Sequence, residues 1–192
     1  MNKSILKAVQ RREFLMTIPP WLAASCLSVY ALSRQEASQA ILSLPEELTA
    51  SELEAVGKSV LAKDLENYFG KGYSCAESML MVGLRFLKKP EDLVWIAAGF
   101  GGGILHRETC GFLTAGIMNL GLAASRLNME RKEAKDWNKQ KVNEYWAWWI
   151  SQAPLRCADI RKEGTSSGVC RRLGLLAAAK IEEMILPVTR SS

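Results

Sequence analysis

The sequence has no Cys-x-x-Cys pair, although five of its 192 residues are cysteines. The missing pair excludes a thioredoxin-type motif, and the absence of Cys-x-x-Cys-His excludes attachment of a c-type haem. No Gly-Lys-Ser/Thr follows the glycine-rich run at 99–103, so a phosphate-binding loop is not predicted. No acid–base pair or nucleophile triad supports a particular reaction, and whether the protein is an enzyme stays open.

The folded part of the chain also lacks a basic stripe. The formal net charge is +5, but residues 1–36 hold five Lys or Arg against two Asp or Glu, whereas residues 37–192 hold twenty against eighteen. A nucleic-acid interface needs clustered basic residues on the folded domain. We therefore expect no nucleic-acid partner.

The first 36 residues are typical of a targeting segment, followed by a single domain at 37–192. A basic stretch precedes a mostly apolar run at residues 14–32, which is the pattern of an export signal. Arg11 and Arg12, followed by Phe14 and Leu15, resemble the twin-arginine consensus, whose route carries proteins already folded and often loaded with a cofactor. We expect a protein in the periplasm or on the outer face of the cytoplasmic membrane.

Three fates of this leader remain open. The 19 residues of the apolar run approach the roughly 20 that cross a bilayer as a helix, so the segment is either cleaved or kept as a membrane anchor. Residues 22–26 also resemble a lipobox loosely, which makes lipidation of Cys26 a minor alternative.

Apolar residues recur at helical spacing along the domain, and no segment alternates with period two for long enough to predict a strand. Ser74 and Glu77 form a capping box at a helix start, and Thr109 is a candidate cap for a later helix. We expect an all-α fold, a bundle of five to six helices. The predicted helices cover residues 44–69, 74–89, 91–100, 110–128, 130–151 and 167–186.

Four cysteines lie in this domain: Cys75, Cys110, Cys157 and Cys170. Cys75 and Cys110 fall in the first turn of a predicted helix, where the partial positive charge of the helix start stabilises a thiolate and lowers the thiol pKa. This placement suits a metal ligand or a nucleophile, whereas free cysteines also occur as small buried core residues. The spacing leaves open two disulfides, a four-thiolate metal site or cluster, or one redox pair with two further cysteines.

The surroundings of the cysteines form a recognisable pattern. Gly-Tyr-Ser-Cys-Ala-Glu at 72–77 is followed by three glycines at 101–103, by Thr-Cys-Gly-Phe-Leu-Thr-Ala-Gly at 109–116, and then by Cys157 and Cys170. This order resembles the C_GCAxxG_C_C family of redox-active proteins over roughly residues 50–185. The chain departs from the family name at Thr109, Gly111 and Thr114, where the name has Gly, Ala and Gly.

The resemblance implies a helical fold and a redox or cluster site built from four cysteines. His106, the only histidine, is a weaker candidate as a ligand or proton carrier. The residues carried over are Cys75, Cys110, Cys157 and Cys170 as the redox or metal-binding set, with Gly111 and Gly116 as close-packing positions beside it.

Our main hypothesis is an iron–sulfur cluster in an electron-transfer protein, because four thiolates suit a cluster and folded export suits a protein that acquires its cofactor in the cytoplasm. One alternative is a thiol–disulfide redox protein in which two cysteines cycle. Another is a non-enzymatic protein with structural zinc or disulfides, although such zinc sites usually have close-set cysteine pairs. The expected partner is a redox protein. In the aromatic run at 145–149 we favour core packing or contact between copies of a homo-oligomer over contact with the membrane interface.

Overall fold

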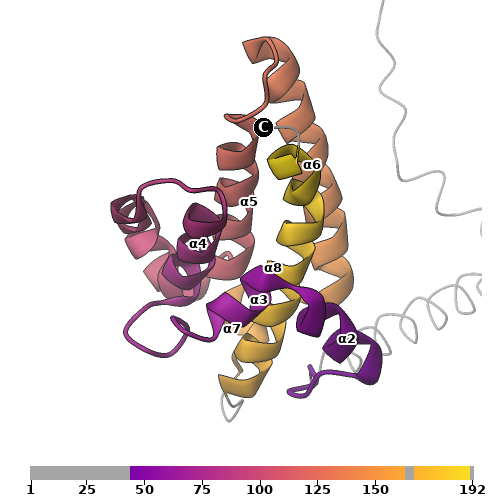
Figure 1. The fold of residues 1–192 in the computed structure, drawn as a ribbon. Helices are drawn as coiled ribbons and strands as arrows, with labels where there is room; N and C mark the ends of the chain where they lie inside the picture. The colour runs from indigo at the N-terminus through magenta and orange to yellow at the C-terminus, as the bar shows by residue number, and fades with distance from the viewer. Residues whose placement is uncertain (1–43, 163–166, 191–192) are drawn as a thin grey trace, which may run out of the picture. The chain divides into compact units, whose positions relative to one another are not determined.

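The computed structural model describes residues 44–162 and 167–190, with side chains up to Leu186 in the last helix. The predicted leader, residues 1–36 with Arg11, Arg12 and Cys26, lies outside the described residues. The described residues form seven α-helices, two short helical segments of other types and no strand (Figure 1). The predicted all-α class is confirmed, with more helices than the five to six expected. Within the described ranges, every helix is too short or too polar to form a membrane span.

The first predicted helix is two helices, because Ser59 interrupts it. α2 spans Ala50–Lys58 and α3 spans Val60–Leu65. The backbone of Ser59 is extended, with φ −84° and ψ 127°, and its hydroxyl accepts a hydrogen bond from the N–H of Ala62 at 3.0 Å. A serine in this role starts a new helix. The start of α2 is set by a capping box at Thr49, so the prediction placed this helix start too early.

The next segment holds the first cysteine. α4 spans Cys75–Phe86 and begins with the predicted capping box of Ser74 and Glu77, which is confirmed. It ends before the predicted residue 89, because Lys88 has a φ of 52°, which an α-helix does not allow. The 3₁₀-helix η2, Glu91–Phe100, occupies the predicted range, and the π-type turn η3, Gly103–Arg107, follows it.

The remaining α-helices are α5 (Gly111–Ala124), α6 (Arg131–Gln152), α7 (Cys157–Ile160) and α8 (Ser167–Arg190). α7 was not predicted, because its single turn is too short to show a helical repeat. No side-chain hydrogen bond caps α5, whose N-cap is Cys110. Thr109 instead pairs with Arg156 in an isolated antiparallel bridge, so the predicted Thr109 cap was wrong.

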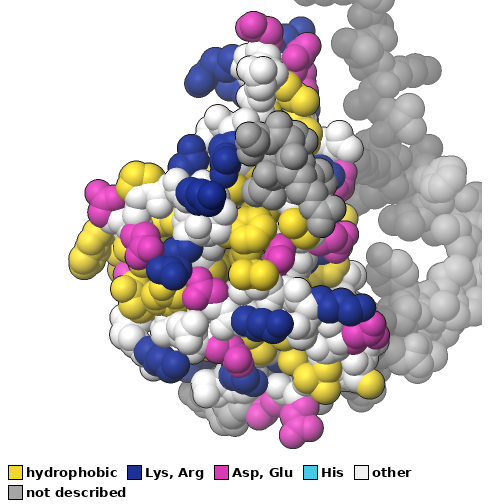
Figure 2. Space-filling model, viewed as in Figure 1, with side chains coloured by type: hydrophobic (Ala, Val, Ile, Leu, Met, Phe, Trp, Pro, Cys, Tyr) yellow, Lys and Arg dark blue, Asp and Glu magenta, His cyan; other side chains and the backbone are white. Residues whose placement is uncertain are grey.

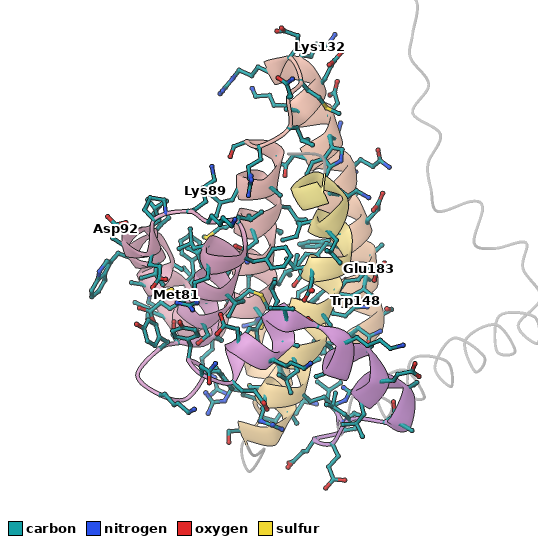
Figure 3. All side chains as sticks on the ribbon, viewed as in Figure 1. Met81, Lys89, Asp92, Lys132, Trp148 and Glu183 are labelled. Atoms are coloured by element: carbon teal, nitrogen blue, oxygen red, sulfur yellow. The ribbon has the colours of Figure 1, made fainter. Side chains whose placement is uncertain are left out.

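α5 lies at the centre of the packing, since it contacts α4, α6 and α8 (Figure 1). Side chains fill the spaces between these helices, as Figure 3 shows around Trp148 and Met81. In the aromatic run of α6, Tyr145 and Trp149 are fully buried, whereas Trp146 is 40% exposed. Two of its four aromatic side chains therefore belong to the core, and the partly buried Trp148 packs against it.

Two polar contacts hold α8 against the N-terminal helices. The carboxylate of Glu182 is buried and accepts hydrogen bonds from the hydroxyl of Ser59 at 2.5 Å and the N–H of Leu61 at 2.9 Å. Arg172, also buried, forms an ion pair with Glu52 of α2. The Arg172 contact lies near the first turn of α8, which contains Cys170, and the Glu182 contacts hold the helix farther along its length.

Candidate functional site

The four cysteines of the domain line one cavity of about 240 Å³. All four are free thiols, Cys110 and Cys157 buried, Cys75 and Cys170 partly buried. The other lining residues are Phe69, Ser74, Gly102, Phe112, Ile160, Arg161 and Ser167. The structure therefore brings the four predicted site cysteines together.

Each cysteine comes from the start of a different helix. Cys75 is the first residue of α4, Cys110 is the N-cap of α5, and Cys157 is the first residue of α7. Cys170 lies in the first turn of α8. Figure 1 shows the beginnings of α5 and α8 at the same end of the helical domain, beside α7. The starts of four helices therefore meet at one cavity.

A short backbone pairing joins the segments of Cys110 and Cys157. The N–H of Cys110 donates to the carbonyl of Leu155 at 2.9 Å, and the N–H of Cys157 donates to the carbonyl of Glu108 at 2.6 Å. Arg156 adds a two-pronged ion pair with the carboxylate of Glu108, at 2.9 and 3.0 Å. The pairing fixes the register of two cysteines that are distant in the sequence.

Two glycines, which have no side chain, let the walls of the cavity approach each other closely. A Cβ at Gly111 would stand 2.5 Å from the sulfur of Cys75, and a Cβ at Gly103 would stand 2.7 Å from the Cβ of Cys157. Real Cβ atoms do not tolerate such distances, so both positions need glycine. Gly116 differs, since a Cβ there would meet the ring of Tyr145 at 2.6 Å. Gly111 thus packs beside the cysteines, and Gly116 packs against α6.

Burial raises the pKa of Cys110, Cys157 and Cys170. Desolvation and the neighbouring thiol of Cys75 raise the pKa of Cys110, and backbone hydrogen bonds from Phe112 and Leu113 only partly oppose this. Burial likewise raises the pKa of Cys157, and it raises the pKa of Cys170 to about 11. The predicted lowering of the thiol pKa by the helix start was wrong for Cys110, because the loss of solvent outweighs the helix field.

Two arginines bring positive charge to one side of the cavity. The guanidinium of Arg161 opposes the rise in the pKa of both Cys157 and Cys170, and that of Arg107 acts on the pKa of Cys157. Arg107 also donates a hydrogen bond to the backbone carbonyl of Arg161, which links η3 to the end of α7. No sequence pattern pointed to either arginine: Arg107 acts on Cys157 across 50 residues of chain, and Arg161 lies in a segment for which no helix was predicted.

The other predicted candidate, His106, is exposed and is absent from the cavity lining. The apolar lining residues Phe69, Phe112 and Ile160 were not singled out from the sequence, since they match ordinary core positions there.

In the described part of the chain, no three Cys, His, Asp or Glu side chains stand close enough together to hold one metal ion. The four thiols are distributed around the cavity instead of surrounding one point.

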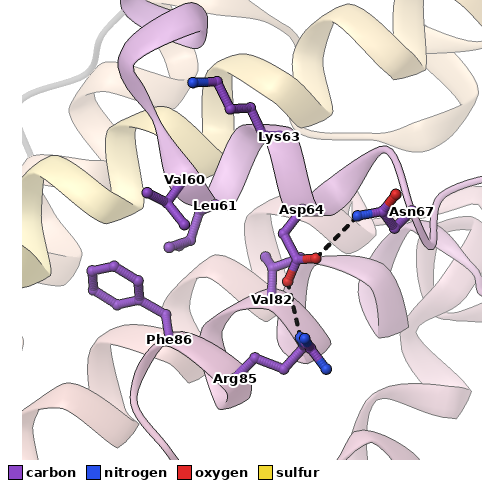
Figure 4. Close-up of a pocket in the computed structure, with 8 residues that line it drawn as sticks. All are labelled: Val60, Leu61, Lys63, Asp64, Asn67, Val82, Arg85 and Phe86. Atoms are coloured by element: carbon purple, nitrogen blue, oxygen red, sulfur yellow. Dashed lines mark hydrogen bonds and ion pairs between the residues drawn. The ribbon is translucent and has the colours of Figure 1, made fainter.

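A larger hollow of about 450 Å³ lies between α3 and α4, away from the cysteines (Figure 4). Three of its polar side chains are paired, because the carboxylate of Asp64 accepts hydrogen bonds from Asn67 at 3.2 Å and Arg85 at 3.1 Å. The remaining lining is mainly apolar, with Val60, Leu61, Val82 and Phe86. It offers no redox chemistry.

Comparison with known proteins gave one match. Residues 73–184 fit a family model described as "Putative redox-active protein (C_GCAxxG_C_C)". The matched range is more than half of the chain and contains all four cavity cysteines. No curated protein and no solved structure matches the chain.

Proposed function

Since the chain belongs to the C_GCAxxG_C_C family of redox-active proteins, we propose that its four-cysteine cavity binds an iron–sulfur cluster and that the protein transfers electrons. The observation that carries the proposal is the lining of one cavity by four free thiols from four helix starts. Bound there, a cluster supplies reversible one-electron chemistry.

The size of the cavity supports a small inorganic group. Its volume of about 240 Å³ lies below the ~300–1,000 Å³ of sites for drug-sized ligands, yet far above the ~10–15 Å³ that a cavity needs to hold one water. A cluster holds its cysteine ligands farther apart than a single zinc ion does. Thiols distributed around a cavity therefore suit a cluster better than one ion.

The chain's own residues would hold and tune such a group. Cys75, Cys110, Cys157 and Cys170 are the only thiols among the lining residues and would be its ligands. The N–H groups of Phe112 and Leu113 donate to the sulfur of Cys110, and hydrogen bonds to ligating sulfurs raise the potential of a cluster. Phe69 and Phe112 supply apolar lining beside it.

The leader supports a proposal for where in the cell this activity takes place. Its twin-arginine-like start, Arg11 and Arg12, belongs to a route that exports folded proteins with their cofactors. We propose that the cluster is inserted in the cytoplasm and that the domain then works in the periplasm or on the outer face of the membrane. Fusing residues 1–36 to a reporter tests this, since replacing both arginines with lysine should stop export.

Anaerobic purification of the full chain tests the cluster directly. We expect iron, acid-labile sulfide and visible absorption, all lost when Cys75 or Cys110 is replaced by Ser. Cys26→Ser is the matched control and should keep the iron. Colourless protein with zinc, or with a pair of thiols that cycles on mild oxidation and reduction, would refute the cluster and favour one of the alternatives.

A further inference from the structure

The two helical segments that precede Cys110, η2 and η3, carry exposed apolar side chains. Among the described residues, four of the nine exposed large hydrophobic side chains fall within η2 and η3: Trp95 at 75%, Ile96 at 60%, Ile104 at 41% and Leu105 at 71% exposure. Three residues per turn in η2 bury Val94 and Ala97 and leave positions 95 and 96 outside. We call these four side chains the η2–η3 face.

The backbone of η3 is strained where it presents this face. Ile104 has a φ of 55° and Leu105 a φ of 59°, both in the left-handed region. A β-branched residue there is a genuine outlier. Because both side chains are exposed, core packing does not compensate for the strain. Strained backbone that core packing does not explain is typical of functional sites.

The base of η3 is part of the cavity wall. Gly102 lines the cavity, and Gly103 leaves just enough room for the Cβ of Cys157. The N–H of Glu108 donates to the carbonyl of Gly103 at 2.9 Å, which closes the turn. A molecule seated on Ile104 and Leu105 therefore lies beside the cysteines.

The charges around this end are mainly positive. Arg107 in η3 and Arg161 at the cavity are both exposed, and Arg107 is bound to the backbone of Arg161. The carboxylate of Glu108 is neutralised by Arg156. Asp92 lies one 3₁₀ turn before Trp95, and Figure 3 places it at the left edge of the molecule. The acidic charge therefore borders the η2 end of the η2–η3 face, whereas Arg107 belongs to the η3 end beside the cavity. Hydrophobic side chains reach that edge in Figure 2.

We propose that the η2–η3 face docks an acidic redox protein, whose apolar contact surface covers Trp95, Ile96, Ile104 and Leu105 while its carboxylates meet Arg107 and Arg161. This inference rests on the proposed function, because it names the partner of the same site. Transient electron-transfer complexes have small interfaces, for which four apolar side chains with a charged rim are sufficient. Exposed tryptophan and arginine are the residue types that dominate binding energy at interfaces.

The test measures binding of the full chain to an acidic [2Fe–2S] ferredoxin by titration calorimetry at low ionic strength, with a basic c-type cytochrome as the probe of opposite charge. We expect binding to the ferredoxin alone, weakened by added salt. The double variant Trp95→Gln/Leu105→Gln should bind about tenfold or more weakly. Leu53→Gln/Val60→Gln, which changes side chains that are 56% and 59% exposed elsewhere, is the matched control and should bind normally.

Three results would overturn the docking proposal. These are no salt-sensitive ferredoxin binding, equal weakening by both double variants, or stronger binding to the cytochrome. Two further assays identify other occupants: vesicles with anionic lipids that bind the protein through Leu105 would show a membrane surface, and a dimer that Leu105→Gln dissociates would show a second copy. Either would replace the acidic partner.

Docking and the cluster can fail separately. Binding is measured again with Cys75→Ser, which removes a proposed ligand but none of the η2–η3 face. Ferredoxin binding without iron in any preparation would refute the cluster and keep the docking surface. Iron in the protein without ferredoxin binding would refute the docking surface and keep the cluster.

Discussion

Gly111 packs directly against Cys75, so closely that a Cβ at position 111 would stand 2.5 Å from the sulfur. The same Cβ would stand 3.0 Å from the N–H nitrogen of Ala76 and from the carbonyl oxygen of Phe100. Because backbone atoms lie on two sides, a shift of one side chain could not make room for the added Cβ. The contact joins the starts of α4 and α5, and the position of one cysteine therefore depends on the absence of a side chain beside the other.

Gly111→Ala should disturb the site more than the fold. The added methyl group displaces Cys75, and changes beside a ligand typically weaken metal binding about 10- to 100-fold. We expect iron to be lost correspondingly faster to a chelator, with a loss of about 1–3 kcal/mol in unfolding free energy. Gly121→Ala, in the same helix with no atom within 4 Å, should retain iron and gain up to about 1 kcal/mol. Equal iron loss in both variants would contradict the close-packing role.

Gly116→Ala should have the opposite effects: it should reduce the stability of the fold and leave the iron content unchanged. The new methyl group meets the buried ring of Tyr145, whose hydroxyl donates to the carbonyl of Phe112 at 3.2 Å. Overpacking of this kind costs about 1–3 kcal/mol. We expect a lower midpoint in urea unfolding but unchanged iron per folded chain. Selective loss of iron in a fully stable variant would place Gly116 in the site after all.

Alkylation of the reduced, metal-free protein should report the raised pKa of Cys170. With a pKa of about 11, the thiolate fraction at pH 8 is roughly 100-fold below that of an ordinary thiol of pKa near 9. Iodoacetamide should therefore modify Cys170 slowly, at a rate that rises with pH, as followed by mass spectrometry. Arg161→Gln should slow the reaction further, and Arg161→Lys should restore it. Matching pH profiles in folded and unfolded chains would contradict the expected shift.

The same raised pKa has a consequence for stability. The folded state keeps its proton above the pH at which the unfolded chain loses it, so this stabilisation is complete below the unfolded pKa. It is lost as the pH rises toward 11. Metal-free protein should accordingly unfold more easily at alkaline pH.

Glu52→Gln should destabilise the tether of α2 to α8 in a pH-dependent way. Burial raises the pKa of Glu52, but hydrogen bonds from the N–H of Thr49 and from Arg172 outweigh it, so the net pKa is lowered. The substitution leaves the buried Arg172 charge unpaired, at a cost of about 1–3 kcal/mol near neutral pH. Because a lowered pKa contributes stability that is lost in acid, wild type and variant should converge as the pH falls below about 4. Thermal unfolding at several pH values checks this, and a constant difference would contradict it.

Much of the helical pattern could be predicted because its signals are local. The capping box of Ser74 and Glu77, the turn before α4 and the apolar repeats all act within a few residues. The split at Ser59 was missed, because the serine acts as both an interruption and a cap, and its hydroxyl is held by Glu182 from α8. The single turn of α7 was missed for lack of length.

The sequence by itself determined the all-α class, the order of the four cysteines and their glycine-rich surroundings, since these follow from local periodicity and residue type. Only the tertiary structure decided that the cysteines share one cavity, because that depends on the long-range pairing of Thr109 with Arg156 and on the packing of α4 against α5. It also showed that Gly111 packs beside the cysteines whereas Gly116 packs against α6, and it placed His106 in solvent. The acidity of the thiols was decided there too, because desolvation of a buried sulfur outweighs the field of a helix start.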